Sequence, residues 1–143
     1  MTRTGAYVLL FRLARAERIA VGRLGDIELA RGQYAYVGSA MNGLDARIER
    51  HLRARKRRHW HIDYLLERAA VTAVLEFESA TRLECELNGR LLLETRSVQP
   101  VRGFGSSDCR CRSHLHYLGR SPPAVRELAA TLGGRVRTAN PAL

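Results

Sequence analysis

The stretch from residue 32 to residue 40, GQYAYVGSA, constrains the fold of this chain more than any other. Its tyrosine and small apolar residues predict a strand that ends in a glycine turn at Gly38. A helix is predicted next, and it carries Arg47 and His51 four residues apart, on one helical face. Tyrosine hydroxyls and a guanidinium brought together in a basic protein are the groups that a phosphodiester-cleaving site needs.

The rest of the chain predicts one α/β (α+β) domain over residues 1–133, with a flexible tail at 134–143. The domain is expected to hold a small, mainly antiparallel sheet flanked by helices. Strands are predicted at residues 5–13, 18–23, 27–29, 32–38, 71–77 and 114–118. Helices are predicted at residues 42–53, 59–66, 82–95 and 122–132.

Composition narrows the cellular setting. Hydrophobic residues make up 45% of the 143 and charged residues 27%, which are values of a globular chain. The longest apolar runs fall far short of the roughly 18 residues of a membrane span, and the first residues lack the features of a secretory signal. We therefore expect a cytoplasmic protein with no membrane partner.

The positive charge is the strongest bulk signal. The formal net charge is +10, and all but one of the 24 basic residues are arginines. The planar guanidinium matches phosphate oxygens in pairs, so the composition favours nucleic acid as partner. The alternative is a genomic composition bias that replaces lysine by arginine throughout.

Several short motifs follow one another in order along the chain. They are GAY at 5–7, YVG at 36–38, Arg47 with His51, Glu84, and GFGSSDCRCRSHL at 103–115. In this order they resemble the GIY-YIG nuclease superfamily, in particular its small prokaryotic Uri-type branch. Two features depart from that pattern: Ala6 and Val37 stand in place of isoleucine, and residues 16–31 add a hairpin between the tyrosine strands. Such an insertion can leave the two strands adjacent in the sheet.

The resemblance implies a metal-dependent endonuclease that hydrolyses phosphodiester bonds in DNA or, less favoured, RNA. It implies five catalytic residues: Tyr7, Tyr36, Arg47, His51 and Glu84. Glu84 would bind Mg²⁺ or Mn²⁺, since Mg²⁺ often takes only one or two carboxylates. Arg47 would neutralise developing phosphoryl charge. Tyr7 would act as a base if Arg47 and the metal favour its phenolate, and would otherwise orient water, while Tyr36 positions the substrate.

Each of these residues also has an ordinary interpretation. The tyrosines could be amphipathic strand residues, Arg47 and His51 a solvated helix surface, and Glu84 a carboxylate favoured by the helix dipole. The chain would then be a non-catalytic nucleic-acid-binding domain on the same scaffold.

A basic segment lies beside the predicted site. We expect the nucleic-acid backbone to be held by Arg50, Arg53, Arg55, Lys56, Arg57, Arg58 and His61. The alternative is a solvated charge cluster. Trp60 is interpreted as a core anchor, and His59 is expected to meet Asp63 on a helical face that His61 does not share.

The cysteines allow a third interpretation, a zinc-bearing structural module. Cys109, Cys111 and His114 have the composition of a zinc clip, and Cys85 would be the fourth ligand. Structural zinc sites usually separate their cysteines by two to four residues, however, and Cys85 lies on a distant helix. The other readings are a tight turn with buried thiols, or a Gly/Ser loop whose amides hold a phosphate.

Overall fold

A five-stranded antiparallel sheet forms the centre of the computed structural model, which describes residues 2–121 and 123–137. The strand order is β6-β4-β1-β5-β7. The strands are β1 (Gly5–Leu13), β4 (Gly32–Ala40), β5 (Ala70–Glu78), β6 (Leu115–Gly119) and β7 (Arg135–Arg137). The prediction of a mainly antiparallel α+β domain is confirmed.

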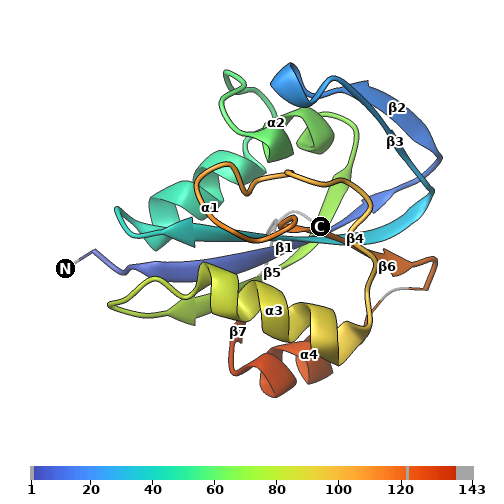
Figure 1. The fold of residues 1–143 in the computed structure, drawn as a ribbon. Coiled ribbons are helices and arrows are strands. Elements are labelled where there is room, and N and C mark those ends of the chain that lie inside the picture. Colours follow the sequence, from blue (N-terminus) through green and yellow to red (C-terminus); the bar gives the residue numbers. More distant parts are fainter. Residues whose placement is uncertain (1, 122, 138–143) are drawn as a thin grey trace.

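Helices cover both faces of this sheet (Figure 1). The first face carries α1 (Leu44–Leu52) and α2 (His61–Leu66), and the second carries α3 (Glu84–Thr95) and α4 (Val125–Leu132). Because side chains alternate along a strand, odd-numbered residues of β1 such as Tyr7 and Leu9 pack toward α1 and α2, and even-numbered ones such as Val8 pack toward α3 and α4. Burial on both faces explains why β1 reads as a continuous apolar run.

The inserted hairpin leaves the two tyrosine strands adjacent. Strands β2 (Glu17–Ala20) and β3 (Asp26–Leu29) pair only with each other, joined by a 3₁₀ turn (Gly22–Leu24). Strand β1 therefore pairs directly with β4, with Tyr7 opposite Gly38 and Leu9 opposite Tyr36. Tyr7 and Tyr36 consequently lie on the same face, with ring centroids 6.5 Å apart.

Three predicted boundaries are wrong. The chain does not become a tail at residue 134, because Arg135–Arg137 pairs with β5 and Arg137 Nη1 lies 3.0 Å from Glu76 Oε2; residues 138–143 lie outside the described part. Helix α2 begins at His61 rather than at residue 59, since Asp63 Oδ2 accepts the backbone N–H groups of His59 and Trp60. The last helix begins at Val125 rather than at residue 122.

The turn expected at Gly38 lies later, because β4 continues to Ala40. Gly38 is instead needed for packing, since a Cβ at this position would overlap Cζ and Oη of Tyr7. The glycine thus leaves room for the end of the Tyr7 ring beside the neighbouring strand. Among the described residues, no helix combines the length and apolar character needed to cross a membrane.

Gly38→Ala should displace the Tyr7 ring and lower the free energy of unfolding by roughly 1–3 kcal/mol, the usual cost of overpacking. Gly89→Ala is the matched control, because no atom lies within 4 Å of a Cβ there and alanine favours a helix. Urea unfolding of both variants measures the effect. A Gly38→Ala midpoint equal to that of wild type would show that Tyr7 does not need this space.

Candidate active site

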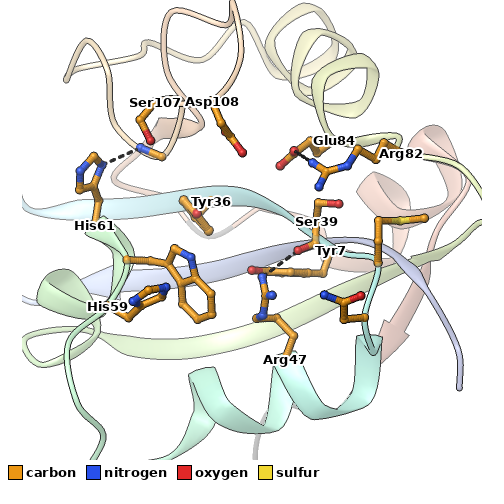
Figure 2. Close-up of a pocket in the computed structure, with 14 residues that line it drawn as sticks. Tyr7, Tyr36, Ser39, Arg47, His59, His61, Arg82, Glu84, Ser107 and Asp108 are labelled. Atoms are coloured by element: carbon orange, nitrogen blue, oxygen red, sulfur yellow. Dashed lines mark hydrogen bonds and ion pairs between the residues drawn. The ribbon is translucent and has the colours of Figure 1, made fainter.

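A pocket of about 340 Å³ opens where β4 loses its neighbour β6. The ladder between β4 and β6 ends at Tyr36, opposite Leu115. Beyond that point, the N-terminus of α3 and the loop at residues 103–113 approach the end of β4 (Figure 2). The pocket is far larger than the roughly 30 Å³ that one water occupies in the liquid, so it has room for a substrate group.

The pocket gathers residues that are far apart in the sequence. Four of the five predicted catalytic residues line it: Tyr7 from β1, Tyr36 from β4, Arg47 from α1 and Glu84 from α3. The fifth, His51, lies directly behind Tyr7 in the core, where its Nε2 is 2.7 Å from the Tyr7 hydroxyl.

His51 connects the pocket to a buried carboxylate. Its Nδ1 lies 3.9 Å from Asp63 Oδ1 and has no hydrogen-bond partner among the described residues. The pKa of His51 is lowered to about 3, chiefly by burial. The nearby cation Arg47 acts in the same direction, and Asp63 offsets only part of the effect. The imidazole is therefore neutral, and with its proton on Nδ1 facing Asp63, Nε2 accepts the hydroxyl proton of Tyr7.

Sequence reasoning missed the place of Asp63. Although burial opposes ionisation, hydrogen bonds from Arg50 and from two backbone amides lower the pKa of Asp63. Arg50 donates to both carboxylate oxygens at 2.9 Å. The expected meeting of His59 with Asp63 occurs through the His59 amide, at 2.8 Å, and not through side chains on one helix face. An aspartate at the third position of a short helix was the available signal.

Both tyrosines are protonated in this pocket. Burial raises the pKa of Tyr7 and of Tyr36 well above the ordinary value, and Arg47 opposes the shift without overcoming it. Tyr7 was expected to act as a base only if Arg47 and a metal ion favour its phenolate form. Arg47 alone does not bring the pKa of Tyr7 low enough for that. The alternative expectation, that Tyr7 orients water, fits a hydroxyl that lines the pocket and donates its proton to His51.

Arg47 is held rigidly at the wall of the pocket. Its Nη1 donates to the Ser39 carbonyl at 2.8 Å, and its guanidinium lies 4.2 Å from the centre of the Trp60 ring. Arg50 lies 4.4 Å from the same ring. Trp60 is therefore a half-buried platform for two arginines, which is more than the core anchor that the sequence indicated.

The acidic wall of the pocket lies opposite Arg47. Figure 2 draws Glu84 and Asp108 at the top of the pocket and Arg47 at the bottom. The Glu84 side chain is 14% exposed, and Arg82 Nη1 lies 3.3 Å from one of its oxygens. Mg²⁺ typically binds one or two carboxylates together with waters and substrate phosphates. Glu84 and Asp108 both line the pocket, and they are the carboxylates there that could bind this cation, while Arg82 balances the charge of Glu84.

The predicted nucleic-acid contacts divide into two groups. Arg50 is engaged by Asp63, Arg58 by Glu67 at 2.6 Å, and Lys56 by the carbonyls of residues 51 and 53. His61 lines the pocket, where its Nδ1 accepts the Gly105 amide at 2.9 Å. The remaining basic side chains are exposed and form no ion pair within the described part of the chain: Arg53, Arg55 and Arg57.

The cysteines are not the buried thiols of a tight turn. Cys85 is exposed, and Cys109 and Cys111 are half-exposed. Together with His114 they form a group that could hold a metal ion, since their ligand atoms all lie within 4.8 Å of one another. Cys85 was expected to lie on a helix distant from the other three ligands. In the folded chain it lies close to them.

Comparison with known proteins gives one match. The model of the domain of unknown function DUF123 matches residues 6–136. No curated protein and no solved structure matches the chain. The matched region includes every strand and helix of the central fold except the first residue of β1 and the last of β7. The chain therefore belongs to the DUF123 family.

Proposed function

We propose that this protein is a metal-dependent endonuclease that hydrolyses phosphodiester bonds in DNA, as the resemblance to the Uri-type GIY-YIG nucleases implies. One observation carries the proposal. Tyr7, Tyr36, Arg47 and Glu84, which lie on four different elements, line a single pocket, with His51 hydrogen-bonded behind Tyr7. A hydroxyl, a fixed cation and an acidic ligand around one cavity are the groups that phosphodiester hydrolysis uses.

Tyr7 and His51 act on the attacking water. The Tyr7 oxygen accepts a hydrogen bond from the water while its own proton is donated to His51 Nε2. As the water oxygen forms its bond to phosphorus, the water proton passes to Tyr7 and the Tyr7 proton passes to His51. Asp63, 3.9 Å from Nδ1, favours the resulting imidazolium and opposes the burial that lowers the pKa of His51 to about 3 in the free protein. The negative charge of the bound phosphodiester raises the proton affinity of His51 in the same sense.

Charge on the phosphoryl group is stabilised from both walls. Arg47, fixed by Ser39 and Trp60, faces the phosphoryl oxygens from below. When Mg²⁺ or Mn²⁺ is bound by Glu84 with Asp108, it supplies Lewis-acid stabilisation of the charged oxygens. The bond from phosphorus to the leaving sugar oxygen then breaks, and that oxygen takes a proton from solvent. Tyr36, buried beside Tyr7, positions the phosphate.

The nucleic acid approaches over the segment between α1 and α2. Arg53, Arg55 and Arg57 present guanidinium groups without intramolecular ion pairs there, and His59 and Trp60 continue from that segment into the pocket. Free thiols suit a reducing compartment, and we place the protein in the cytoplasm. A non-catalytic nucleic-acid-binding domain is the second candidate. It is favoured by the ion pair between Arg82 and Glu84, which balances the charge of the acid without a metal ion.

Glu84→Gln should lower the rate of Mg²⁺-dependent cleavage of a labelled DNA by at least about 100-fold, the usual scale for loss of transition-state electrostatics. DNA binding should change little. Glu86→Gln is the matched control, because Glu86 lies on the same first turn of α3 outside this pocket. Single-turnover assays with and without EDTA measure the rates. Tight binding by wild type without cleavage of any DNA or RNA tested would support the non-catalytic nucleic-acid-binding domain instead.

Replacement of Arg53, Arg55 and Arg57 by glutamine should flatten the salt dependence of DNA binding. Each lost phosphate contact reduces the slope of log K against log salt by about 0.9, so three contacts give about 2.7. The control removes the same charge from Arg120, Arg126 and Arg135, which are exposed elsewhere. Fluorescence anisotropy over a salt series gives the slopes. Equal slopes for the two triple variants would show that the segment between α1 and α2 does not contact DNA.

A further inference from the structure

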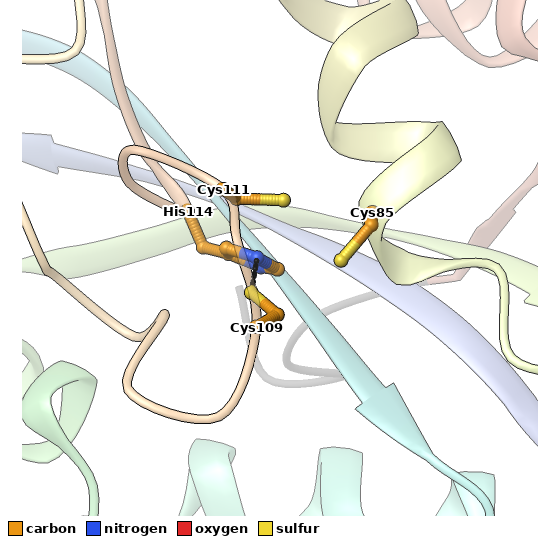
Figure 3. Close-up of side chains that lie close together, drawn as sticks. All are labelled: Cys85, Cys109, Cys111 and His114. Atoms are coloured by element: carbon orange, nitrogen blue, oxygen red, sulfur yellow. Dashed lines mark hydrogen bonds between the residues drawn. The ribbon is translucent and has the colours of Figure 1, made fainter.

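The three cysteines of the chain converge on one histidine (Figure 3). Cys85 lies on the first turn of α3, Cys109 and Cys111 lie in the loop at 103–113, and His114 directly precedes β6. Their ligand atoms all lie within 4.8 Å of one another. A tetrahedral zinc ion with Zn–S bonds of about 2.3 Å separates two sulfurs by about 3.8 Å, so only small side-chain movements would complete such a site.

His114 is oriented as a metal ligand is. Its Nδ1 lies 2.9 Å from the Val37 carbonyl, to which it donates its proton, and the side chain is fully buried. Nε2 is therefore left with a free lone pair, 3.3 Å from Cys109 Sγ. The corresponding N···S separation across a tetrahedral zinc ion is about 3.6 Å. A backbone carbonyl holding the second ring nitrogen is the usual support of a zinc-bound histidine.

The local chemistry favours zinc over a disulfide or a cluster of free thiols. An odd number of cysteines leaves one unpaired after any disulfide forms. A bound zinc ion would replace the thiol protons of all three cysteines. Sulfur and imidazole ligands select zinc rather than magnesium.

We propose that Cys85, Cys109, Cys111 and His114 form a structural zinc site that joins α3 to the loop at 103–113. Four protein ligands leave no position for substrate, so the ion serves structure and not hydrolysis. Cys85 directly follows Glu84, and Cys109 directly follows Asp108. The zinc ion would therefore hold together the two segments that carry the acidic wall of the pocket, a consequence that rests on the proposed function.

The same junction has a second tie that does not depend on metal. Asn88 of α3 donates from Nδ2 to the Ser113 carbonyl at 2.8 Å, and its Oδ1 lies 2.6 Å from His116 Nε2. A variant that lacks one cysteine should therefore keep α3 docked on the loop well enough to be purified. Zinc content can then be compared between folded proteins.

The test is zinc content by mass spectrometry after purification without chelators, together with absorption of the Co²⁺-substituted protein. Wild type should hold about one zinc per chain, and its Co²⁺ form should show the thiolate charge-transfer and tetrahedral bands expected of a sulfur-rich site. Cys109→Ser and Cys111→Ser should lose stoichiometric zinc. His59→Gln should retain it, because His59 is an exposed histidine outside the cluster.

Glu84→Gln should keep its zinc while losing cleavage, which separates failure of the zinc site from failure of the nuclease proposal. Wild type that purifies without zinc and shows no thiolate band with Co²⁺ would overturn the site, and this result requires no variant to fold. Retention of full zinc by both cysteine variants would overturn it as well. So would a titration that finds fewer than three reactive thiols in the denatured, metal-free protein, since a disulfide would then occupy the ligands.

Discussion

The hydrogen bond of 2.7 Å between the Tyr7 hydroxyl and His51 Nε2 is the interaction on which the rest of the site depends. It joins the central strand β1 to α1 at the inner wall of the pocket, and His51 is buried behind Tyr7. Gly38 provides the space for the ring, and Asp63 faces the far side of the imidazole. Because the partner of Tyr7 is fixed, its hydroxyl is held at one point on the wall of the pocket, where the proposed reaction would use it.

The basic and the acidic side chains of the pocket come from different parts of the fold. The cationic side belongs to α1, where Trp60 and the Ser39 carbonyl fix Arg47. The acidic side belongs to the N-terminus of α3, which packs on the other face of the sheet, and to the loop at 103–113, whose Phe104 packs on the same face as α1 and α2. The two segments meet where β6 no longer pairs with β4. An interaction that holds α3 and the loop together is needed at this junction, and the cysteine cluster lies there. The proposed zinc site and the proposed nuclease site thus both lie where the pairing of β4 with β6 ends.

Sequence reasoning succeeded where the signal is local and failed where it is not. The apolar runs predicted β1 and β4 to within two residues. The resemblance to a nuclease family, which does not rest on local signals, named four residues that do line one pocket: Tyr7, Tyr36, Arg47 and Glu84. The role of Asp63 depends on a neighbour twelve residues earlier and on a cap, and neither produces a periodic pattern. Arg50 was assigned to nucleic acid because a charge run shows nothing of the buried carboxylate that binds it.

Cys85 seemed too distant to be a ligand because sequence separation does not reveal that the first turn of α3 reaches the loop. Strand β7 is only three residues long and was hidden in a basic terminal segment.

Single-turnover cleavage by Tyr7→Phe and Tyr34→Phe, with Mg²⁺ and a DNA that wild type cuts, tests the central claim most directly. Each variant removes one hydroxyl from the same core, but the Tyr34 hydroxyl donates to the Ala30 carbonyl and does not line the pocket. The costs in folding stability should therefore be similar, about 1–3 kcal/mol for the partner left unpaired. The account predicts a loss of roughly 100-fold or more in rate for Tyr7→Phe, the scale of general acid–base catalysis, and a rate near that of wild type for Tyr34→Phe. Equal rates for the two variants would contradict it.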